Sequence, residues 1–325
     1  MILWTASDIP PQNGRTAVIT GTGGLGYENA LALARAGGAI ILAGRDARKG
    51  ADAVNRIRSE VALAKIRFEQ LDLADLVSVT AFAERLAKQR DSLDLLINNA
   101  GVMVPPQRQV TADGFELQFG TNYLGHFALT AHLLPLLHKG RGARVISLSS
   151  IAATGGAINF ADLNAVQRYK AMPAYSQSKL ACLMFALELQ RRSDAGGWGI
   201  SSIAAHPGIS RTDLLHNGPG RWSAHGLARS LLPFLFQPAA QGALPTLFAA
   251  TSDDAKGGGY YGPDKMGGMR GHPTEATIPP QAMDEAVAAR LWDVSEALTG
   301  VRFANATSEC QQPRLERENP HTVAA

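Results

Sequence analysis

The sequence contains little cysteine, no long apolar run and little excess charge of either sign. Its two cysteines, Cys182 and Cys310, are too few for a secreted disulfide framework and lack the CxxC spacing of a zinc site. No apolar run approaches the roughly 18 residues that span a membrane, and the first residues lack the basic start of a signal peptide. We therefore expect a soluble, cytoplasmic protein.

Charge and histidine spacing argue against two further classes of protein. Lys and Arg number 31 against 28 Asp and Glu, and the small excess is not gathered into a basic run, so no nucleic-acid partner is expected. The eight histidines never form an HxxxH pair or lie near a cysteine pair, so we assign no metal.

What the sequence does contain is an alternation of short aliphatic runs with longer helical patterns, which is typical of βαβ units. We expect an α/β domain with one doubly wound parallel sheet of about seven strands and helices on both faces, over residues 14–303. An N-terminal extension, 1–13, precedes it, and a disordered tail, 304–325, follows. The predicted helices include 27–36, 76–89 and 280–298; the predicted strands are 16–20, 39–43, 66–71, 93–97, 144–148 and 200–205, with a last one in the glycine-rich stretch 257–271.

A glycine-rich loop follows the first predicted strand and opens directly into a helix. It reads Thr20-Gly21-Thr22-Gly23-Gly24-Leu25-Gly26, in which Gly21, Gly23 and Gly26 form the pattern G-x-G-x-x-G. Glycines there let the backbone turn tightly and approach a pyrophosphate, which then lies on the positive end of the helix dipole. The strand before and the helix after the loop favour a Rossmann-type dinucleotide site over an ordinary βα turn.

The end of the second predicted strand indicates which dinucleotide binds. An acidic residue there accepts hydrogen bonds from the adenine ribose hydroxyls, whereas a basic one pairs with a 2′-phosphate. The strand ends Ala43-Gly44-Arg45-Asp46, and Asp46 lies beyond it, where we expect it to cap the next helix. Arg45 suits a phosphate by charge and geometry. NADP(H) is therefore favoured over NAD(H).

Tyr175 and Lys179 lie four residues apart, which places them on one face of a helix. A free tyrosine has a pKa of ~10 and is a poor acid at neutral pH, but a neighbouring ammonium favours its phenolate. Alone, such a pair is a weak signal, and a surface helix with a solvated lysine is the alternative.

Further motifs follow in the order typical of the short-chain dehydrogenase/reductase superfamily, which the sequence resembles over about residues 14–265. Three spans, 39–46, 119–127 and 150–187, look most like the retinol-dehydrogenase-like branch, whose members interconvert apolar carbonyl compounds and alcohols. The additional motifs are Asn98-Asn99-Ala100-Gly101, Thr121-Asn122-Tyr123-Leu124-Gly125-His126-Phe127, Ser149-Ser150 and His206-Pro207-Gly208.

The resemblance implies a catalytic set of Tyr175, Lys179, Ser150 and Asn122. Tyr175 would exchange a proton with the substrate oxygen while the nicotinamide exchanges a hydride with its carbon. Ser150 would hydrogen-bond that oxygen, Lys179 would bind the nicotinamide ribose, and Asn122 would hold a water that links Lys179 to solvent. The implied cofactor contacts are Tyr175, Lys179, Gly21, Thr22, Gly23, Gly24, Leu25, Gly26, Arg45, Asp72, Leu73, Asn99, Ala100, Gly101, Pro207, Gly208, Ser210 and Thr212. Simpler interpretations make Asp72 a helix N-cap, Asn98 and Asn99 turn formers, and Thr212 a surface residue.

Two departures from the family pattern bear on these expectations. The glycine loop is one residue shorter than the usual T-G-x-x-x-G-x-G, so a side chain that helps to hold a 2′-phosphate is missing and Arg45 must do more. An insert at 159–172 precedes Tyr175 and is placed to mask a face through which many relatives dimerise. The apolar stripe that follows is expected in the core, with a homo-oligomer contact as the alternative; it comprises Leu180, Leu183, Met184 and Leu187.

The stretch 211–237 is rich in leucine, phenylalanine and tryptophan, and the resemblance places a substrate flap there. We therefore expect a lipophilic ketone, aldehyde or alcohol as substrate, with core-packed helices or contact with a membrane surface as alternatives. The expected function is that of an NADP(H)-dependent oxidoreductase. A cofactor-binding regulatory or scaffold protein is one alternative, and a nucleotide-sugar epimerase or dehydratase, which should carry a larger C-terminal domain, is another.

Overall fold

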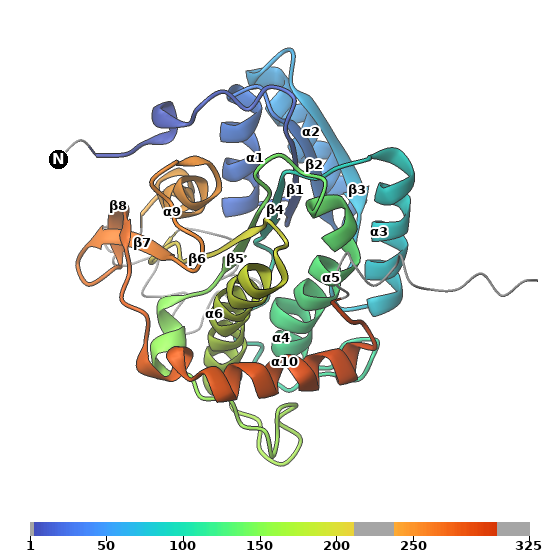
Figure 1. Cartoon of the computed structure of the whole chain (residues 1–325), viewed down its shortest axis with the longest axis vertical. Helices are drawn as coiled ribbons and strands as arrows, with labels where there is room; N and C mark the ends of the chain where they lie inside the picture. Colours follow the sequence, from blue (N-terminus) through green and yellow to red (C-terminus); the bar gives the residue numbers. More distant parts are fainter. Residues whose placement is uncertain (1–2, 211–236, 304–325) are drawn as a thin grey trace, which may run out of the picture.

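The centre of the structure, a computed structural model that describes residues 3–210 and 237–303, is a sheet in the order β3-β2-β1-β4-β5-β6-β7-β8 (Figure 1). β1 to β7 run parallel, and β8 pairs antiparallel with β7. The doubly wound parallel sheet is thus confirmed, and the antiparallel eighth strand is an addition to it. The strands are β1 (Thr16–Thr20), β2 (Ala39–Gly44), β3 (Lys65–Gln70), β4 (Leu95–Asn98), β5 (Arg144–Leu148), β6 (Ser201–Ala205), β7 (Tyr260–Lys265) and β8 (Arg270–Glu275).

The central strands are continuous aliphatic runs because both of their faces are covered. β1 and β4 are buried along their whole length, and Val18 of β1 lies opposite Ile41 of β2 and Leu96 of β4. The chain leaves β1 towards β2 and β3, and then returns to place β4 on the other side of β1. The carboxyl ends of β1 and β4 therefore border the crevice in which doubly wound sheets bind their ligands.

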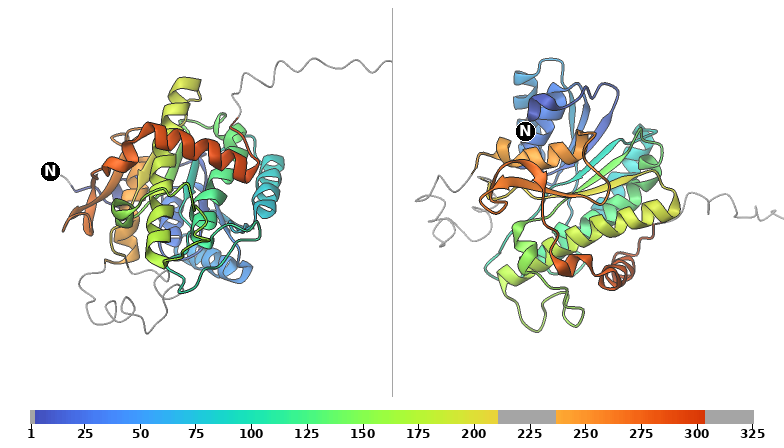
Figure 2. Two further views of the ribbon diagram at one scale, coloured as in Figure 1. Left: turned by 90° about the horizontal axis from the view of Figure 1, so that it is seen from below. Right: turned by 60° about the vertical axis from the view of Figure 1, so that its left-hand side comes forward.

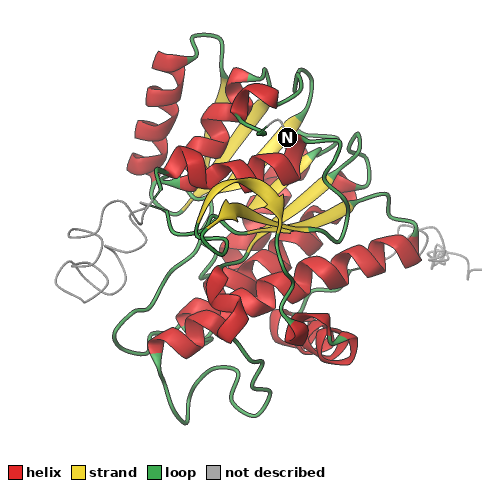
Figure 3. Ribbon diagram, turned by 90° about the vertical axis from the view of Figure 1, so that its left-hand side faces the viewer, coloured by secondary structure: helices red, strands yellow, loops and turns green. Residues whose placement is uncertain are grey.

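Helices cover both faces of the sheet, as expected (Figure 3). One face packs against α1 (Leu25–Arg35), α2 (Ala47–Glu60) and α9 (Ala239–Thr251). The other face packs against α3 (Leu76–Gln89), α5 (Gly125–Leu137) and α6 (Ala171–Gly196). Shorter elements complete the chain: α4 (Leu117–Phe119), the π-helical turn η2 (Gly120–Leu124), and the 3-10 turns η1 (Ala6–Asp8), η3 (Ile151–Gly155) and η5 (Pro280–Met283).

The last helix, α10 (Glu285–Thr299), lies across α6 on the outside of the second helical layer (Figure 2). The single helix predicted at 280–298 is wrong in its start, because Asp284 takes the N-cap position and accepts a hydrogen bond from Val287 N at 3.0 Å. η5 precedes that cap as a separate turn. Trp292 of α10 packs into the helical layer beneath and is only 1% exposed.

The apolar stripe on α6 lies in the core of the chain, as expected. Leu180, Leu183 and Met184 are buried, and Leu187 is partly buried against the same cluster. The insert at 159–172 is tied to its surroundings by hydrogen bonds: Arg108 Nε donates to Asn164 O at 2.9 Å, and Gln177 Nε2 donates to Leu163 O at 3.0 Å.

The N-terminal segment from Leu3 lies against α9, where Trp4 meets Phe248 edge to face with ring centroids 5.5 Å apart. None of the helices within 3–210 and 237–303 is long and apolar enough to cross a membrane. Residues 211–236, which make up nearly all of the expected flap, and the expected disordered tail at 304–325 lie outside the described residues.

Candidate active site

The predicted site residues lie just beyond the carboxyl ends of six neighbouring parallel strands, at one edge of the sheet. Tyr175 and Lys179 come from the first turns of α6, and Asn122 comes from η2. Thr212 lies outside the described residues. Residues 21–26 follow β1, Arg45 follows β2, Asp72 and Leu73 follow β3, Asn99, Ala100 and Gly101 follow β4, Ser150 follows β5, and Pro207, Gly208 and Ser210 follow β6.

The glycine loop after β1 has the geometry that a pyrophosphate requires. Gly21 has φ +93° and Gly24 has φ +50°, values that favour glycine. A Cβ on Gly26 would collide with the carbonyl oxygen of Gly21, so the loop closes tightly onto α1. Gly24 is the N-cap of α1, and no side chain of the described residues caps the helix. Gly26 N donates to Gly23 O at 3.1 Å, and the other N–H groups of the first turn are available to an anion.

At the end of β2, the space beside the backbone is already filled. A Cβ on Gly44 would lie 2.9 Å from Cγ2 of Thr22, so Thr22 would have to shift to make room for a side chain there. Gly44 thus supplies no acidic side chain at the position where NAD-binding sites place one. Arg45 is exposed. Asp46 is the N-cap of α2 and accepts a hydrogen bond from Lys49 N at 3.0 Å, which confirms the prediction for it.

The segment after β4 is fixed to the end of β1. Thr20 Oγ1 accepts hydrogen bonds from Asn99 N and Ala100 N, both at 2.9 Å, and Thr20 O accepts one from Asn99 Nδ2 at 2.7 Å. Asn99 Oδ1 is buried and has no partner within the described part of the chain, which suits a site that takes a polar ligand.

Glycine at position 101 leaves room for two predicted catalytic side chains that approach its backbone. A Cβ there would lie 3.0 Å from Asn122 Oδ1 and 3.6 Å from Lys179 Nζ. Lys179 is 5% exposed, donates from Nζ to Leu148 O at 3.0 Å, and lies 6.0 Å from the ring centroid of Tyr175. The structure therefore brings Tyr175, Lys179 and Asn122 together beside the segment that follows β4.

Ser150 begins η3, where its Oγ accepts a hydrogen bond from Ala152 N at 3.2 Å. The neighbouring Ser149 Oγ donates to the carbonyl of Lys179 at 2.8 Å, which fixes the end of β5 to α6. Tyr260 at the start of β7 also reaches this point, with its hydroxyl 3.5 Å from Ser150 O, and burial raises the pKa of the Tyr260 phenol.

Asn122 clamps the backbone of Val102. Its Oδ1 accepts from Val102 N at 2.7 Å, and its Nδ2 donates to Val102 O and to Ser178 Oγ, both at 3.0 Å. The Asn122 carbonyl accepts from His126 Nδ1 at 2.9 Å and from Cys182 Sγ at 3.1 Å. These bonds hold Asn122 rigidly; its water-holding role stays a prediction.

Asp72 is not the N-cap that the simpler interpretation made it. Its Oδ1 accepts from Ala74 N at 3.0 Å in a local turn, whereas Asp75 caps α3 through hydrogen bonds from Val77 N and Ser78 N. Leu73 is buried, and its carbonyl closely approaches Gly125 at the start of α5.

The glycine-rich stretch at 257–271 supports the loop after β6. A Cβ on Gly208 would lie 2.7 Å from Met269 C, and Ile209 N donates to Met269 O at 2.8 Å. A Cβ on Gly262 would lie 2.6 Å from Cδ2 of His206. The β7–β8 hairpin thus packs its own backbone against residues 206–209, and bulkier residues would separate them.

Two residues that the sequence reasoning missed hold the site together. Thr20 anchors the segment after β4, and its place directly before the glycine pattern is a signal that could have identified it. Gln237 is 1% exposed and donates to Pro207 O at 2.7 Å, while Gly271 N donates to its Oε1 at 3.1 Å. Gln237 has no local signal, because its partners come from distant parts of the chain.

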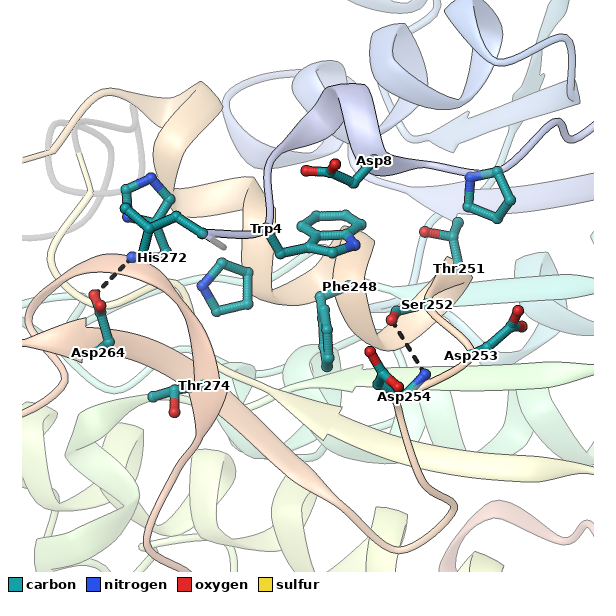
Figure 4. Close-up of a pocket in the computed structure, with 13 residues that line it drawn as sticks. Trp4, Asp8, Phe248, Thr251, Ser252, Asp253, Asp254, Asp264, His272 and Thr274 are labelled. Atoms are coloured by element: carbon teal, nitrogen blue, oxygen red, sulfur yellow. Dashed lines mark hydrogen bonds between the residues drawn. The ribbon is translucent and has the colours of Figure 1, made fainter. Parts of the chain in front are cut away.

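A separate cavity of about 500 Å³ lies between the N-terminal segment, α9 and the β7–β8 hairpin (Figure 4). Trp4 and Phe248 form its apolar part, and four aspartates, Asp8, Asp253, Asp254 and Asp264, line it. Its carboxylates do not suit the phosphates of a dinucleotide, and none of the predicted site residues lines it. Across 3–210 and 237–303, no three His, Cys, Asp or Glu side chains are grouped as a metal site would need.

Comparisons with known proteins agree with this geometry. Residues 15–219 match the short chain dehydrogenase family. The chain is 41% identical to Retinol dehydrogenase 13 of Mus musculus over 300 residues, which cover 90% of this chain and 86% of that protein. It is 39% identical to Polyprenol dehydrogenase of Mus musculus over 298 residues, again 90% and 86% of the two chains.

The chain is also similar to a Mycobacterium paratuberculosis protein of unassigned function whose crystal structure is known. The two sequences are 42% identical, the structures superpose with a TM-score of 0.77, and the match covers 93% of this chain and 100% of that one. The family match spans more than half of the sequence, and the relatives align over most of their length. The chain therefore belongs to the short-chain dehydrogenase family of oxidoreductases and is related to retinol and polyprenol dehydrogenases.

Proposed function

We propose that the protein is an NADP(H)-dependent oxidoreductase that interconverts a lipophilic ketone or aldehyde with its alcohol. The observation that carries the proposal is the convergence of Tyr175, Lys179 and Asn122 beside the segment after β4. The glycine loop that leads into α1 follows the neighbouring strand β1. Related proteins are named for retinol and polyprenol, which are lipophilic alcohols. A substrate of that chemical class is therefore proposed for this chain.

The chain's own residues supply acid–base chemistry and positioning. Tyr175 gives a proton to the carbonyl oxygen, or takes one from the alcohol, and Ser150 hydrogen-bonds the same oxygen. Lys179, held by the Leu148 carbonyl, places a positive charge beside the phenol and a donor toward the ribose. Asn122 keeps the Val102 backbone in place between them. When bound, the nicotinamide supplies the hydride chemistry.

The preference for NADP(H) is proposed from the end of β2. Gly44 carries no acidic side chain at the strand end, the methyl group of Thr22 lies close beside it, and Arg45 is exposed and free to turn toward a 2′-phosphate. Losing a hydrogen bond to a charged group costs about 1.5–3 kcal/mol, or roughly 10- to 150-fold in Kd. Arg45→Ala should weaken NADPH binding by that factor and leave NADH binding unchanged. Arg85→Ala, an exposed arginine beside Glu69, is the control.

The decisive test is NADPH consumption with retinal, a polyprenyl aldehyde and a steroid ketone. Tyr175→Phe should lower kcat by roughly 10²- to 10⁴-fold, the usual contribution of a general acid. Tyr27→Phe should keep wild-type kcat, because it removes only a hydroxyl of α1 that donates to Glu60 of α2. Turnover that survives in Tyr175→Phe overturns the mechanism. A wild-type protein that binds NADPH and reduces none of these compounds favours the scaffold alternative.

Location in the cytoplasm is also proposed, because Cys182 is a buried free thiol and nothing in the sequence calls for an oxidising compartment. Imaging of the tagged full chain tests it. Exclusive recovery with a membrane fraction would contradict it and support the membrane-surface alternative for residues 211–237.

A further inference from the structure

His126 lies at the start of α5, and the proposed mechanism gives it no part. The residue is 4% exposed. Its Nε2 lies 2.9 Å from Thr20 Oγ1, and its Nδ1 lies 2.9 Å from the carbonyl oxygen of Asn122. His126 thus bridges the strand that carries the glycine loop and the turn that carries a predicted catalytic residue.

The chemistry of the partners fixes the direction of both hydrogen bonds. A carbonyl oxygen only accepts, so Nδ1 carries the hydrogen and donates to Asn122 O. In a neutral ring, Nε2 is then the acceptor, and the Thr20 hydroxyl donates to it. The ring is neutral at physiological pH, since burial lowers the pKa of His126 to about 4. The Thr20 oxygen remains an acceptor for the N–H groups of Asn99 and Ala100.

The segment 99–102, whose residues 99–101 are predicted to line the cofactor, is consequently clamped at both ends. Thr20 holds its start through Asn99 and Ala100, and Asn122 holds its end through both backbone groups of Val102. The two clamps come from different elements, one from β1 and one from η2. His126 joins them directly.

We propose that His126 is a positioning residue of the cofactor site, and that its ring sets the glycine loop and the segment 99–102 relative to Asn122. The inference rests on the proposed function only in requiring that this edge of the sheet binds a nicotinamide dinucleotide. An ordinary core histidine would contribute to stability alone. His126 instead contributes to cofactor affinity through Thr20.

The test is a fluorescence titration of the full chain with NADPH in a cycle of variants. His126→Asn keeps an amide donor near the Nδ1 position for Asn122 O and removes the acceptor for Thr20. It should raise the Kd for NADPH by roughly 3- to 10-fold, the effect of one neutral hydrogen bond. In a Thr20→Val background, the same substitution should change Kd by less than twofold, because its partner is already gone.

The control is a histidine of the same helix with the same kind of bond. His132 Nε2 lies 3.2 Å from Thr80 Oγ1 on α3, away from the predicted cofactor residues. His132→Asn should lower the melting temperature and leave the Kd for NADPH unchanged. An unchanged Kd in His126→Asn, or an equal effect of that substitution in the wild-type and the Thr20→Val backgrounds, overturns the proposal.

A second pair of variants keeps the test decisive if His126→Asn does not fold. His126→Phe, which has no ring nitrogen, should raise the Kd for NADPH by roughly 3- to 10-fold in the wild-type background and clearly less in the Thr20→Val background; equal effects in the two backgrounds overturn the proposal. Because the titration needs no substrate, its result is independent of turnover. A wild type that binds NADPH without any turnover contradicts the proposed function and leaves the role of His126 measurable.

Discussion

Replacing Gly26 by alanine tests whether the glycine loop and α1 form the dinucleotide site. The added Cβ would overlap the carbonyl oxygen of Gly21 and lie 2.8 Å from Asn99 Nδ2, whereas ordinary contacts begin near 3.4 Å. Neither obstacle can rotate away, because one is backbone and the other is an amide already bonded to Thr20 O at 2.7 Å. The start of α1 must therefore move away from the loop.

Two consequences follow from that movement, one for stability and one for cofactor binding. Overpacking of this kind costs about 1–3 kcal/mol of the free energy of unfolding, so the melting temperature should fall by a few degrees. The first N–H groups of α1 also move away from the predicted pyrophosphate position. The loss of one charge-assisted hydrogen bond, about 1.5–3 kcal/mol, raises the Kd for NADPH at least about tenfold.

Thermal melting with and without NADPH, together with a fluorescence titration, measures both effects. Gly23→Ala is the matched control for stability, because a Cβ at Gly23 meets no atom of residues 3–210 and 237–303 within 4 Å. Gly23→Ala should have the same melting temperature as the wild type. If Gly26→Ala also has the melting temperature of the wild type and a Kd for NADPH within twofold of it, then the close approach of Gly26 and Gly21 does not shape the site.

Two further predictions concern stability. Trp292→Ala should cost about 3–5 kcal/mol in urea unfolding, because the ring is 1% exposed and packs on Phe127 and Phe185; Asp293→Ala, whose carboxylate is exposed, should cost less than about 0.5 kcal/mol. Burial lowers the pKa of both His126 and His206 to about 4, against about 6.5 in an unfolded chain. The unfolded state then binds more protons between these values, so the free energy of unfolding should fall as pH decreases from about 6.5 to about 4, by up to about 3 kcal/mol per ring. Urea midpoints that stay constant over that range contradict this.

Strand positions were predictable where aliphatic runs are both buried and bounded. β1 and β5 have the expected limits, since Arg15 and Gly21 flank β1, and Gly142 and Ser149 lie close to the two ends of β5. β3 begins one residue earlier and ends one earlier than expected, because Lys65 and Gln70 pair with β2 through backbone groups alone. The antiparallel β8 was not predictable, as its sequence, Arg270–Glu275, has no aliphatic residue and forms a strand only by pairing with β7.

Local rules predicted part of the site and failed where two residues compete. Asp46 was correctly expected to cap α2, because it follows the strand and precedes the helix directly. Asp72 and Asp75 both precede α3, and the spacing alone does not decide which caps it; the structure gives that position to Asp75. The Gly208 approach to Met269 required knowledge of the hairpin that the sequence could not supply.

The bonds that shape the candidate site connect residues far apart in the sequence. Thr20 and His126 are separated by 106 positions, and Asn122 and Ser178 by 56. Motifs therefore indicated which residues are present, while long-range packing decided how they meet. α10 extends the same logic, because Trp292 packs on Phe127, directly after His126, and on Phe185 in the helix that carries Tyr175 and Lys179. A helix beyond every predicted motif thus holds together α5, which carries His126, and α6, which carries Tyr175 and Lys179.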